Sequence, residues 1–189
     1  MTVLISAALV NNVALQQFLG LCPLLGGSRQ LPAAQGLGMA TTLVLTLGAG
    51  LTYLTQHYLL LPLRLEILQT LVFIVLIASL VQLLEVLMRA YQPILHQKLG
   101  LYLPLITSNC AVLGVMLLNT HTPRDFPTAL LYGLGAGLGF WLVLVILACQ
   151  RQRLETADAP QAWRGAPLAL ISAGLTALAF LGLAGVGGT

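Results

Sequence analysis

Hydrophobic and polar residues follow one another along this chain in long blocks, not at the short periods of a surface helix or a half-buried strand. Apolar runs of about 18 residues or more are separated by short polar segments, and a run of that length is typical of a helix that crosses a membrane. The runs cover residues 3 to 22, 36 to 56, 65 to 88, 99 to 119, 128 to 149 and 167 to 187. The pattern predicts an all-α membrane protein with six transmembrane helices in a single domain, residues 1–189.

The composition supports this class and leaves no room for a separate soluble catalytic domain. Hydrophobic residues make up 58% of the 189 residues and charged residues 7%, whereas a soluble domain carries about 25% charged residues. Residues 1 to 9 contain no Lys or Arg, so the basic start of a cleavable signal peptide is missing and we expect the first run to be retained as a span. The net charge of +3 is spread thinly over the loops, which argues against a nucleic-acid site.

The basic residues of the loops predict the orientation, because Lys and Arg accumulate on the cytoplasmic side of a membrane. Two of them, Arg64 and Arg124, fall on one side of the six predicted spans. The other side receives the remaining six: Arg29, Arg89, Lys98, Arg151, Arg153 and Arg164. We therefore expect both termini to face away from the cytoplasm.

Six spans divide into two halves, approximately 1–92 and 93–189, and an odd number of spans in each half forces the halves to insert in opposite directions. A short repeat supports this division: Cys22-Pro23-Leu24-Leu25-Gly26 and Cys110-Ala111-Val112-Leu113-Gly114 share the pattern Cys-x-Leu/Val-Leu-Gly, 88 residues apart. The sequence thus predicts two inverted three-helix repeats. Such repeats bring functional residues together near the midplane, commonly on broken helices.

Both cysteine segments carry the residues of an interrupted helix. Gly20 and Pro23 flank Cys22 after a stretch of amides, and Pro104 precedes Ser108, Asn109 and Cys110. Proline removes a backbone donor and clashes with the preceding turn, and polar groups in lipid require partners. We expect breaks at both cysteines, although hydrogen-bonding and packing between helices would use the same residue types.

The two thiols are candidates for a metal site, because a thiolate inside a membrane needs a compensating charge. An iron–sulfur cluster usually takes four cysteine ligands, and the repeat offers only Cys22 and Cys110. Another protein chain would have to supply the other two. A structural zinc site is the competing metal interpretation.

Three other features have plainer interpretations. Glu85 lies within a predicted span and is a candidate for an ion path, but Arg89 one turn later also fits an interfacial pair. Cys149 has no counterpart in the repeat, and His57, His96 and His121 share no ligand spacing. The glycines of Gly133–Gly139 form two GxxxG pairs, which are typical of close helix contact and not of a nucleotide loop without its strand.

The two cysteine segments also carry a resemblance to a known family. The chain resembles, almost from end to end, the RnfA/NqrE-type family: most closely the RnfA component of the Rnf electron-transport complex and, more distantly, the NqrE component of the sodium-translocating NADH:quinone reductase. The matching segments are 10–12, 18–23, 36–42, 103–114 and 164–165. Members of the family often have Thr-Thr-Asn-Cys where this chain has Thr107-Ser108-Asn109-Cys110, and Ser108 keeps the hydroxyl.

The resemblance implies a multi-pass component of the bacterial inner membrane, with both termini periplasmic. It pairs with a homologous protein of opposite topology, of the RnfE type, and each partner supplies two cysteines to one intramembrane [2Fe-2S] cluster. Carried over by position, Cys22 and Cys110 would hold the iron, with Asn109, Ser108 and Gly20 as donors to the sulfurs. The implied function is an electron relay within an ion-translocating ferredoxin:NAD oxidoreductase. The residues alone leave open a secondary transporter or channel without a redox cofactor, and a scaffold with inert cysteines.

Overall fold

The structure is a computed structural model of the 189-residue chain, and it describes residues 13–17, 19–28, 31–60, 68–91, 106–107, 109–121, 125–155 and 165–186. Helices form nearly all of this part, and it contains no strand. Three helical segments are long and apolar enough to cross a membrane: Leu31–Leu60, Gln69–Leu87 and Phe126–Leu154. Cys110–Thr120 and Ala166–Gly182 are shorter apolar helices. The predicted class, an all-α membrane protein, is confirmed.

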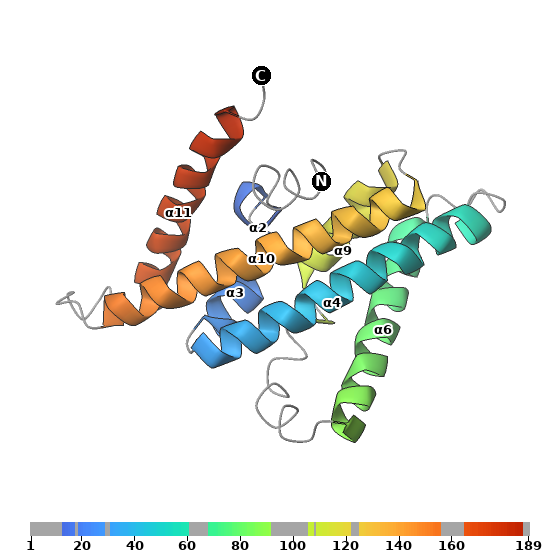
Figure 1. The fold of residues 1–189 in the computed structure, drawn as a ribbon, viewed down its shortest axis with the longest axis horizontal. Helices are drawn as coiled ribbons and strands as arrows, with labels where there is room; N and C mark the ends of the chain where they lie inside the picture. Colours follow the sequence, from blue (N-terminus) through green and yellow to red (C-terminus); the bar gives the residue numbers. More distant parts are fainter. Residues whose placement is uncertain are drawn as a thin grey trace.

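The helices follow one another in an order that is similar in the two halves (Figure 1). In the first half the two short helices α2 and α3 precede the long helices α4 and α6, and in the second half α9 precedes α10 and α11. Their bounds are α2, Val13–Gln16; α3, Leu21–Gly27; α4, Leu31–Thr55, continued by the π-helix η2, Gln56–Leu60; α6, Gln69–Tyr91; α9, Cys110–His121; α10, Phe126–Glu155; and α11, Ala166–Val186.

Several helix starts differ from the prediction because proline was assigned to the turns between spans. Pro32, Pro127 and Pro167 are each the second residue of a helix, α4, α10 and α11 respectively. Proline suits the first turn, where a backbone N–H has no intrahelical partner and the fixed φ is already helical. Gly26 and Gly27, also assigned to a turn, lie inside α3. The long helices therefore begin earlier than their apolar runs suggest.

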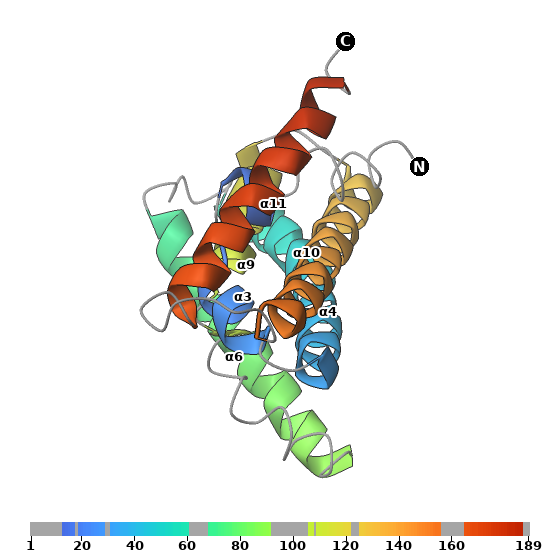
Figure 2. The ribbon, with the colours of Figure 1, turned by 90° about the vertical axis from the view of Figure 1, so that its left-hand side faces the viewer.

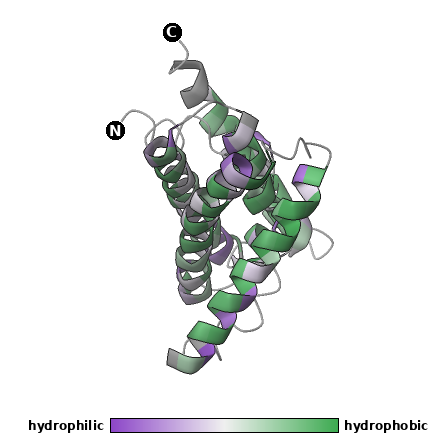
Figure 3. Cartoon of the chain, turned by 90° about the vertical axis from the view of Figure 1, so that its right-hand side faces the viewer, coloured by the Kyte–Doolittle hydropathy of each residue, from purple (hydrophilic) through white to green (hydrophobic). Residues whose placement is uncertain are grey.

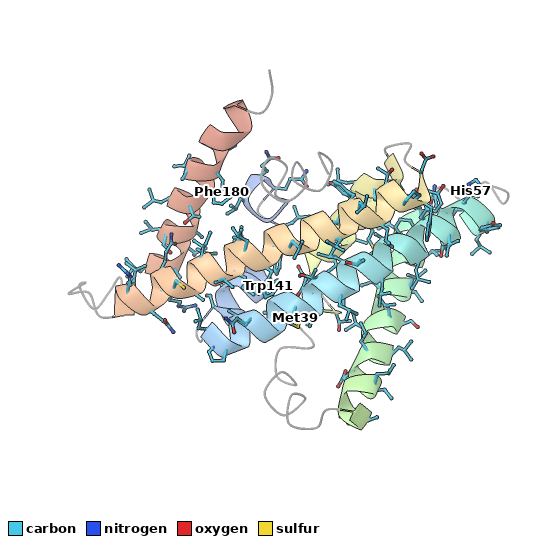
Figure 4. All side chains as sticks on the ribbon, viewed as in Figure 1. Met39, His57, Trp141 and Phe180 are labelled. Atoms are coloured by element: carbon cyan, nitrogen blue, oxygen red, sulfur yellow. The ribbon has the colours of Figure 1, made fainter. Side chains whose placement is uncertain are left out.

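The centre of the molecule is the contact between α4 and α10, which is the most extensive between any two of the described helices. Moving along α4 from Gly50 to Gly38, the partner on α10 changes from Leu130 to Trp141, so the two helices run antiparallel. Figure 4 labels Trp141 where α10 crosses α4. Equivalent helices of an inverted repeat are expected to pair in this way, and α4 and α10 contain the second predicted span of each half.

Small residues permit this contact, as the GxxxG pattern predicted. A Cβ at Gly133 would lie 2.6 Å from Ala49 Cβ and 2.8 Å from the Leu45 carbonyl oxygen, and one at Gly137 would lie 2.8 Å from Thr42 Cα. Real Cβ atoms do not approach other atoms this closely, so glycine at both positions allows the backbones to meet. The predicted role of Gly133 and Gly137 in helix contact is confirmed.

The remaining helices surround this pair and leave broad apolar surfaces outward. The buried residues of α6 end at Val81, and in Figures 1 and 2 part of this helix extends away from the other helices. Figure 3 shows hydrophobic residues on the outward sides of the helices. An apolar exterior is what the hydrocarbon of a membrane requires.

Candidate functional site: two cysteines at the starts of broken helices

The predicted break before Cys22 is present in the structure. Helix α2 ends at Gln16 and α3 begins at Leu21, which makes Cys22 the second residue of a new helix and not the last residue of a span. Gly20 caps α3 with φ +83°, and its carbonyl accepts the first bond of the helix, from Leu24 N–H at 3.2 Å. This backbone conformation favours glycine over any residue with a Cβ. Residues 3–12 of the first predicted span lie outside the described residues.

A second helix begins at the other cysteine. Cys110 is the first residue of α9, and Asn109 before it caps the helix, because Asn109 Oδ1 accepts from Ala111 N–H at 3.0 Å. Asparagine is among the best residues for this role. The first residues of the fourth predicted span, 99–105, lie outside the described residues, as does Ser108. The start of α9 at Cys110 agrees with the expected interruption.

One hydrogen bond joins the two segments. The backbone N–H of Gly20 donates to Cys110 Sγ at 3.1 Å, across 90 residues of sequence. Cys22 is two residues from Gly20, and two residues span at most about 7 Å of chain. The cysteine of the first half and the cysteine of the second half therefore belong to one site.

The backbone at Gly20 is enclosed by groups from the second half of the chain. A Cβ at Gly20 would lie 2.9 Å from Asn109 Oδ1 and 3.0 Å from both Ala111 Cβ and Phe140 Cε2. Glycine is thus required here twice, by its positive φ and by the close approach of its neighbours. The absence of a side chain lets the Gly20 N–H reach the sulfur.

Asn109 has one further property that points to a ligand. Its side chain is 3% exposed, and its Nδ2 atom is buried without a hydrogen-bond partner in the described part of the chain. The bond from Ala111 N–H fixes which side-chain atom is the oxygen, so the donor that remains is the amide NH₂. A buried donor without a partner costs about 1–3 kcal/mol, and such a group calls for an explanation such as a bound group.

The two thiols themselves are exposed on this chain. Across the residues that the structure describes, no three His, Cys, Asp or Glu side chains are grouped closely enough to hold a metal ion. Cys149, also exposed, lies in the second half of α10, far along the helix from its start. The chain thus offers a pair of sulfur ligands on an open face, to which a second protein surface has access.

This donor set fits an iron–sulfur cluster better than an isolated ion. Two thiolates, a backbone N–H already directed at one sulfur and an unused amide donor are the groups that hold and stabilise an anionic cluster. The start of α9 adds a partial positive charge beside Cys110. The two ligands of this chain amount to half of the usual four.

The other candidate residues lie on other helices or outside the described residues. Glu85 is half-buried on α6, beyond the last buried residue of that helix, and its role in an ion path stays a prediction. His57 lies in η2 at the far end of α4, where its ring stacks on Tyr53 with centroids 6.2 Å apart (Figure 4). His96 lies outside the described residues, and the side chain of His121 is likewise not described.

Sequence reasoning missed two polar contacts that hold the other ends of the cysteine helices. Arg151 of α10 donates from Nη1 to the Leu25 carbonyl at 2.8 Å and to Ser28 Oγ at 3.1 Å, at the end of α3. Gln69 of α6 donates from Nε2 to Thr120 Oγ1 at 2.8 Å, at the end of α9. Nothing in the local sequence of either donor identifies its distant partner.

Comparison with known proteins identifies the family. Residues 1–187 match the family model of the Rnf-Nqr subunit, a membrane protein. This chain belongs to the Rnf-Nqr family. The match covers both cysteine segments and both halves of the fold.

Individual members of the Rnf-Nqr family are similar over nearly the whole chain. A protein of Alkalilimnicola ehrlichii is 53% identical over 184 residues, covering 97% of this chain and 95% of its own length. Proteins of Actinobacillus pleuropneumoniae and Cereibacter sphaeroides are 52% and 53% identical over 183 and 184 residues, with the same shares covered. Each of the three is named as the RnfA component of an ion-translocating oxidoreductase complex. The resemblance stated from the cysteine segments is therefore correct at the level of the family.

Proposed function

We propose that this chain is the membrane-embedded electron-relay subunit of an ion-translocating oxidoreductase complex of the Rnf type. The full-length similarity to proteins named as components of such a complex supports the assignment to a complex. The relay role rests on one observation above all, the hydrogen bond from Gly20 N–H to Cys110 Sγ. That bond draws two sequence-distant cysteine segments into a single site.

In this proposal Cys22 and Cys110 provide two of the four ligands of a [2Fe-2S] cluster, and a homologous protein of opposite topology, of the RnfE type, provides the other two. The bound cluster would supply one-electron transfer within the membrane. Gly20 donates a hydrogen bond to the Cys110 sulfur, and Asn109 holds the start of α9 while its amide remains available as a donor. Donors of this kind stabilise negative charge on sulfur ligands and thereby tune a reduction potential.

The exposure of both thiols supports the need for a partner. A cluster held by two exposed cysteines at the surface of a single chain would meet lipid or water on its other side. A second protein that brings two more thiolates completes the ligand set and excludes solvent. The proposed location is the bacterial inner membrane, with the basic ends of α6 and α10, at Arg89, Arg151 and Arg153, on the cytoplasmic side.

The test is iron content and the reduced-state EPR spectrum of the chain purified together with its membrane partner. Wild type should carry iron and give a [2Fe-2S] signal, while Cys22→Ser and Cys110→Ser should each lose it. Cys149→Ser is the matched control, because Cys149 is an exposed helical cysteine outside the pair and should keep the signal.

Wild type without iron, or a signal that survives both substitutions, would overturn the relay function. If ion transport nevertheless persisted without iron, the chain would instead be a transporter or channel. Fusing a reporter to Thr189 tests the orientation independently, because the proposal places the C-terminus in the periplasm and a cytoplasmic signal would contradict it.

A further inference from the structure

We propose that Arg151 is a positioning residue for the Cys22 helix whose charge raises the reduction potential of the cluster held there. This inference rests on the proposed function, since it concerns the same site. It concerns the end of α3 opposite to the cysteine, where the second half of the chain contributes a cation to a helix of the first half.

The geometry at this end of α3 is that of a cap. The last carbonyls of a helix have no intrahelical partner and carry partial negative charge. Arg151 Nη1 donates to one of them, Leu25 O, at 2.8 Å and to the adjacent Ser28 Oγ at 3.1 Å. Ser28 is 3% exposed, and Arg151 is half-buried. The guanidinium therefore fixes where α3 ends, and through this short helix it fixes the position of Cys22.

The surroundings of the guanidinium keep its charge effective. The gap between α3, α10 and α11 has a volume of only about 10 Å³, room for about one water molecule. Leucines form most of its lining on the α3 and α10 sides, namely Leu21, Leu24, Leu25 and Leu147. A charge in such an apolar setting is screened less than one at an open surface.

The two cysteine helices differ in this respect. The contact that Gln69 makes with Thr120 at the end of α9 is neutral, and Thr120 Oγ1 passes its own hydrogen to the Leu117 carbonyl at 2.8 Å. Only the Cys22 side has a cation at its helix end within the part of the chain that the structure describes. The charge asymmetry predicts that Arg151, and not Gln69, affects the potential.

The size of the effect follows from distance. Cys22 precedes Leu25 by three residues, about 4.5 Å along a helix axis, which puts the guanidinium roughly 10 Å from the Cys22 thiol. At an effective dielectric constant of about 20, a unit charge at that distance changes the equilibrium constant for adding one electron by about tenfold. This corresponds to about 59 mV for a one-electron couple. Because the cation stabilises the reduced cluster, its removal should lower the potential.

The experiment is an EPR-monitored redox titration, with dithionite as the reductant, of the chain co-purified with its partner. Arg151→Gln, which keeps a hydrogen-bond donor and loses the charge, should titrate about 59 mV lower than wild type. Arg151→Lys keeps the charge and should stay within a third of that shift. Arg153→Gln is the matched control, since Arg153 lies in the same last turn of α10 but is exposed beside α11, and its potential should be close to that of wild type.

A second variant covers the case in which Arg151→Gln does not fold. Ser28→Asp places a carboxylate beside Arg151 Nη1, keeps the contact between α10 and α3, and should also lower the potential. An unchanged potential in Arg151→Gln, or in Ser28→Asp if only that variant folds, overturns the inference while the cluster remains. Equal shifts in Arg151→Gln and Arg151→Lys overturn the charge effect. Wild type without iron overturns the proposed function itself, and the inference with it.

Discussion

The glycines between α4 and α10 allow a sharp test of the packing. Gly133 and Gly174 are both helix-interior glycines, on α10 and α11, but their surroundings are opposite. A Cβ at Gly133 would lie 2.6 Å from Ala49 Cβ and 2.8 Å from the Leu45 carbonyl, whereas a Cβ at Gly174 would meet no described neighbour within 4 Å. Gly133→Ala and Gly174→Ala thus make the same chemical change in a closed and in an open position.

The expected free energies differ in sign. Alanine favours a helix over glycine by about 1 kcal/mol, and Gly174→Ala should gain up to about that amount. At Gly133 the same gain is opposed by overpacking, which typically costs about 1–3 kcal/mol, because one of the obstructing atoms belongs to the backbone of α4 and cannot rotate away. Gly133→Ala should therefore lose about 0–2 kcal/mol, and the two variants should differ by about 1–3 kcal/mol.

The measurement is thermal unfolding of both variants in the same detergent. For a chain of this size each kcal/mol corresponds to about 2–4 °C in Tm, so Gly174→Ala should melt several degrees above Gly133→Ala. Gly133→Leu extends the series, because a larger side chain cannot be accommodated unless the helices separate. If Gly133→Ala melted at or above Gly174→Ala, the close approach of α4 and α10 would not be present in the folded protein.

Three further predictions concern the cysteine helices. Gly20→Ala should lose about 1–2 kcal/mol of stability because of the left-handed backbone, together with iron in the co-purified complex; a variant with wild-type Tm and iron content would contradict the close approach at that site. Asn109→Ala should cost about 1 kcal/mol by removing the cap of α9, while Asn109→Ser, which retains a capping oxygen, should recover most of the Tm; equal melting of the two would argue against the cap. Gln69→Leu should cost about 0.5–1.5 kcal/mol through the lost bond to Thr120, and an additive loss in the double variant with Thr120→Val would show that the two side chains do not interact.

Local sequence was sufficient to predict the class, the long helices and the breaks at the cysteines. The apolar run at 128 to 149 predicted most of α10, but the helix continues to Glu155 through polar residues that hydropathy assigns to a loop. Proline had the opposite effect at Pro32 and Pro167, where a residue that ends most helices stands in a first turn. Helix ends depend on caps and tertiary contacts, and these are weakly encoded in hydropathy.

The site divides along the same line. Cys22, Cys110, Gly20 and Asn109 could be selected from the sequence because a repeat and a glycine or amide beside a thiol are local signals. Arg151 could not, since its basic side chain at the end of a span has the same appearance as any residue that sets orientation. Its partner on α3 becomes visible only when the two halves are folded together.

The bond from Gly20 to Cys110 also constrains how the protein is made. When the first half emerges from the ribosome, the N–H of Gly20 has no sulfur to meet, because its partner is 90 residues away and still untranslated. The enclosure of Gly20 by Ala111 and Phe140 is missing at the same stage. The thiol pair forms only after the second half is inserted, so iron is delivered to a finished chain and not to a nascent one.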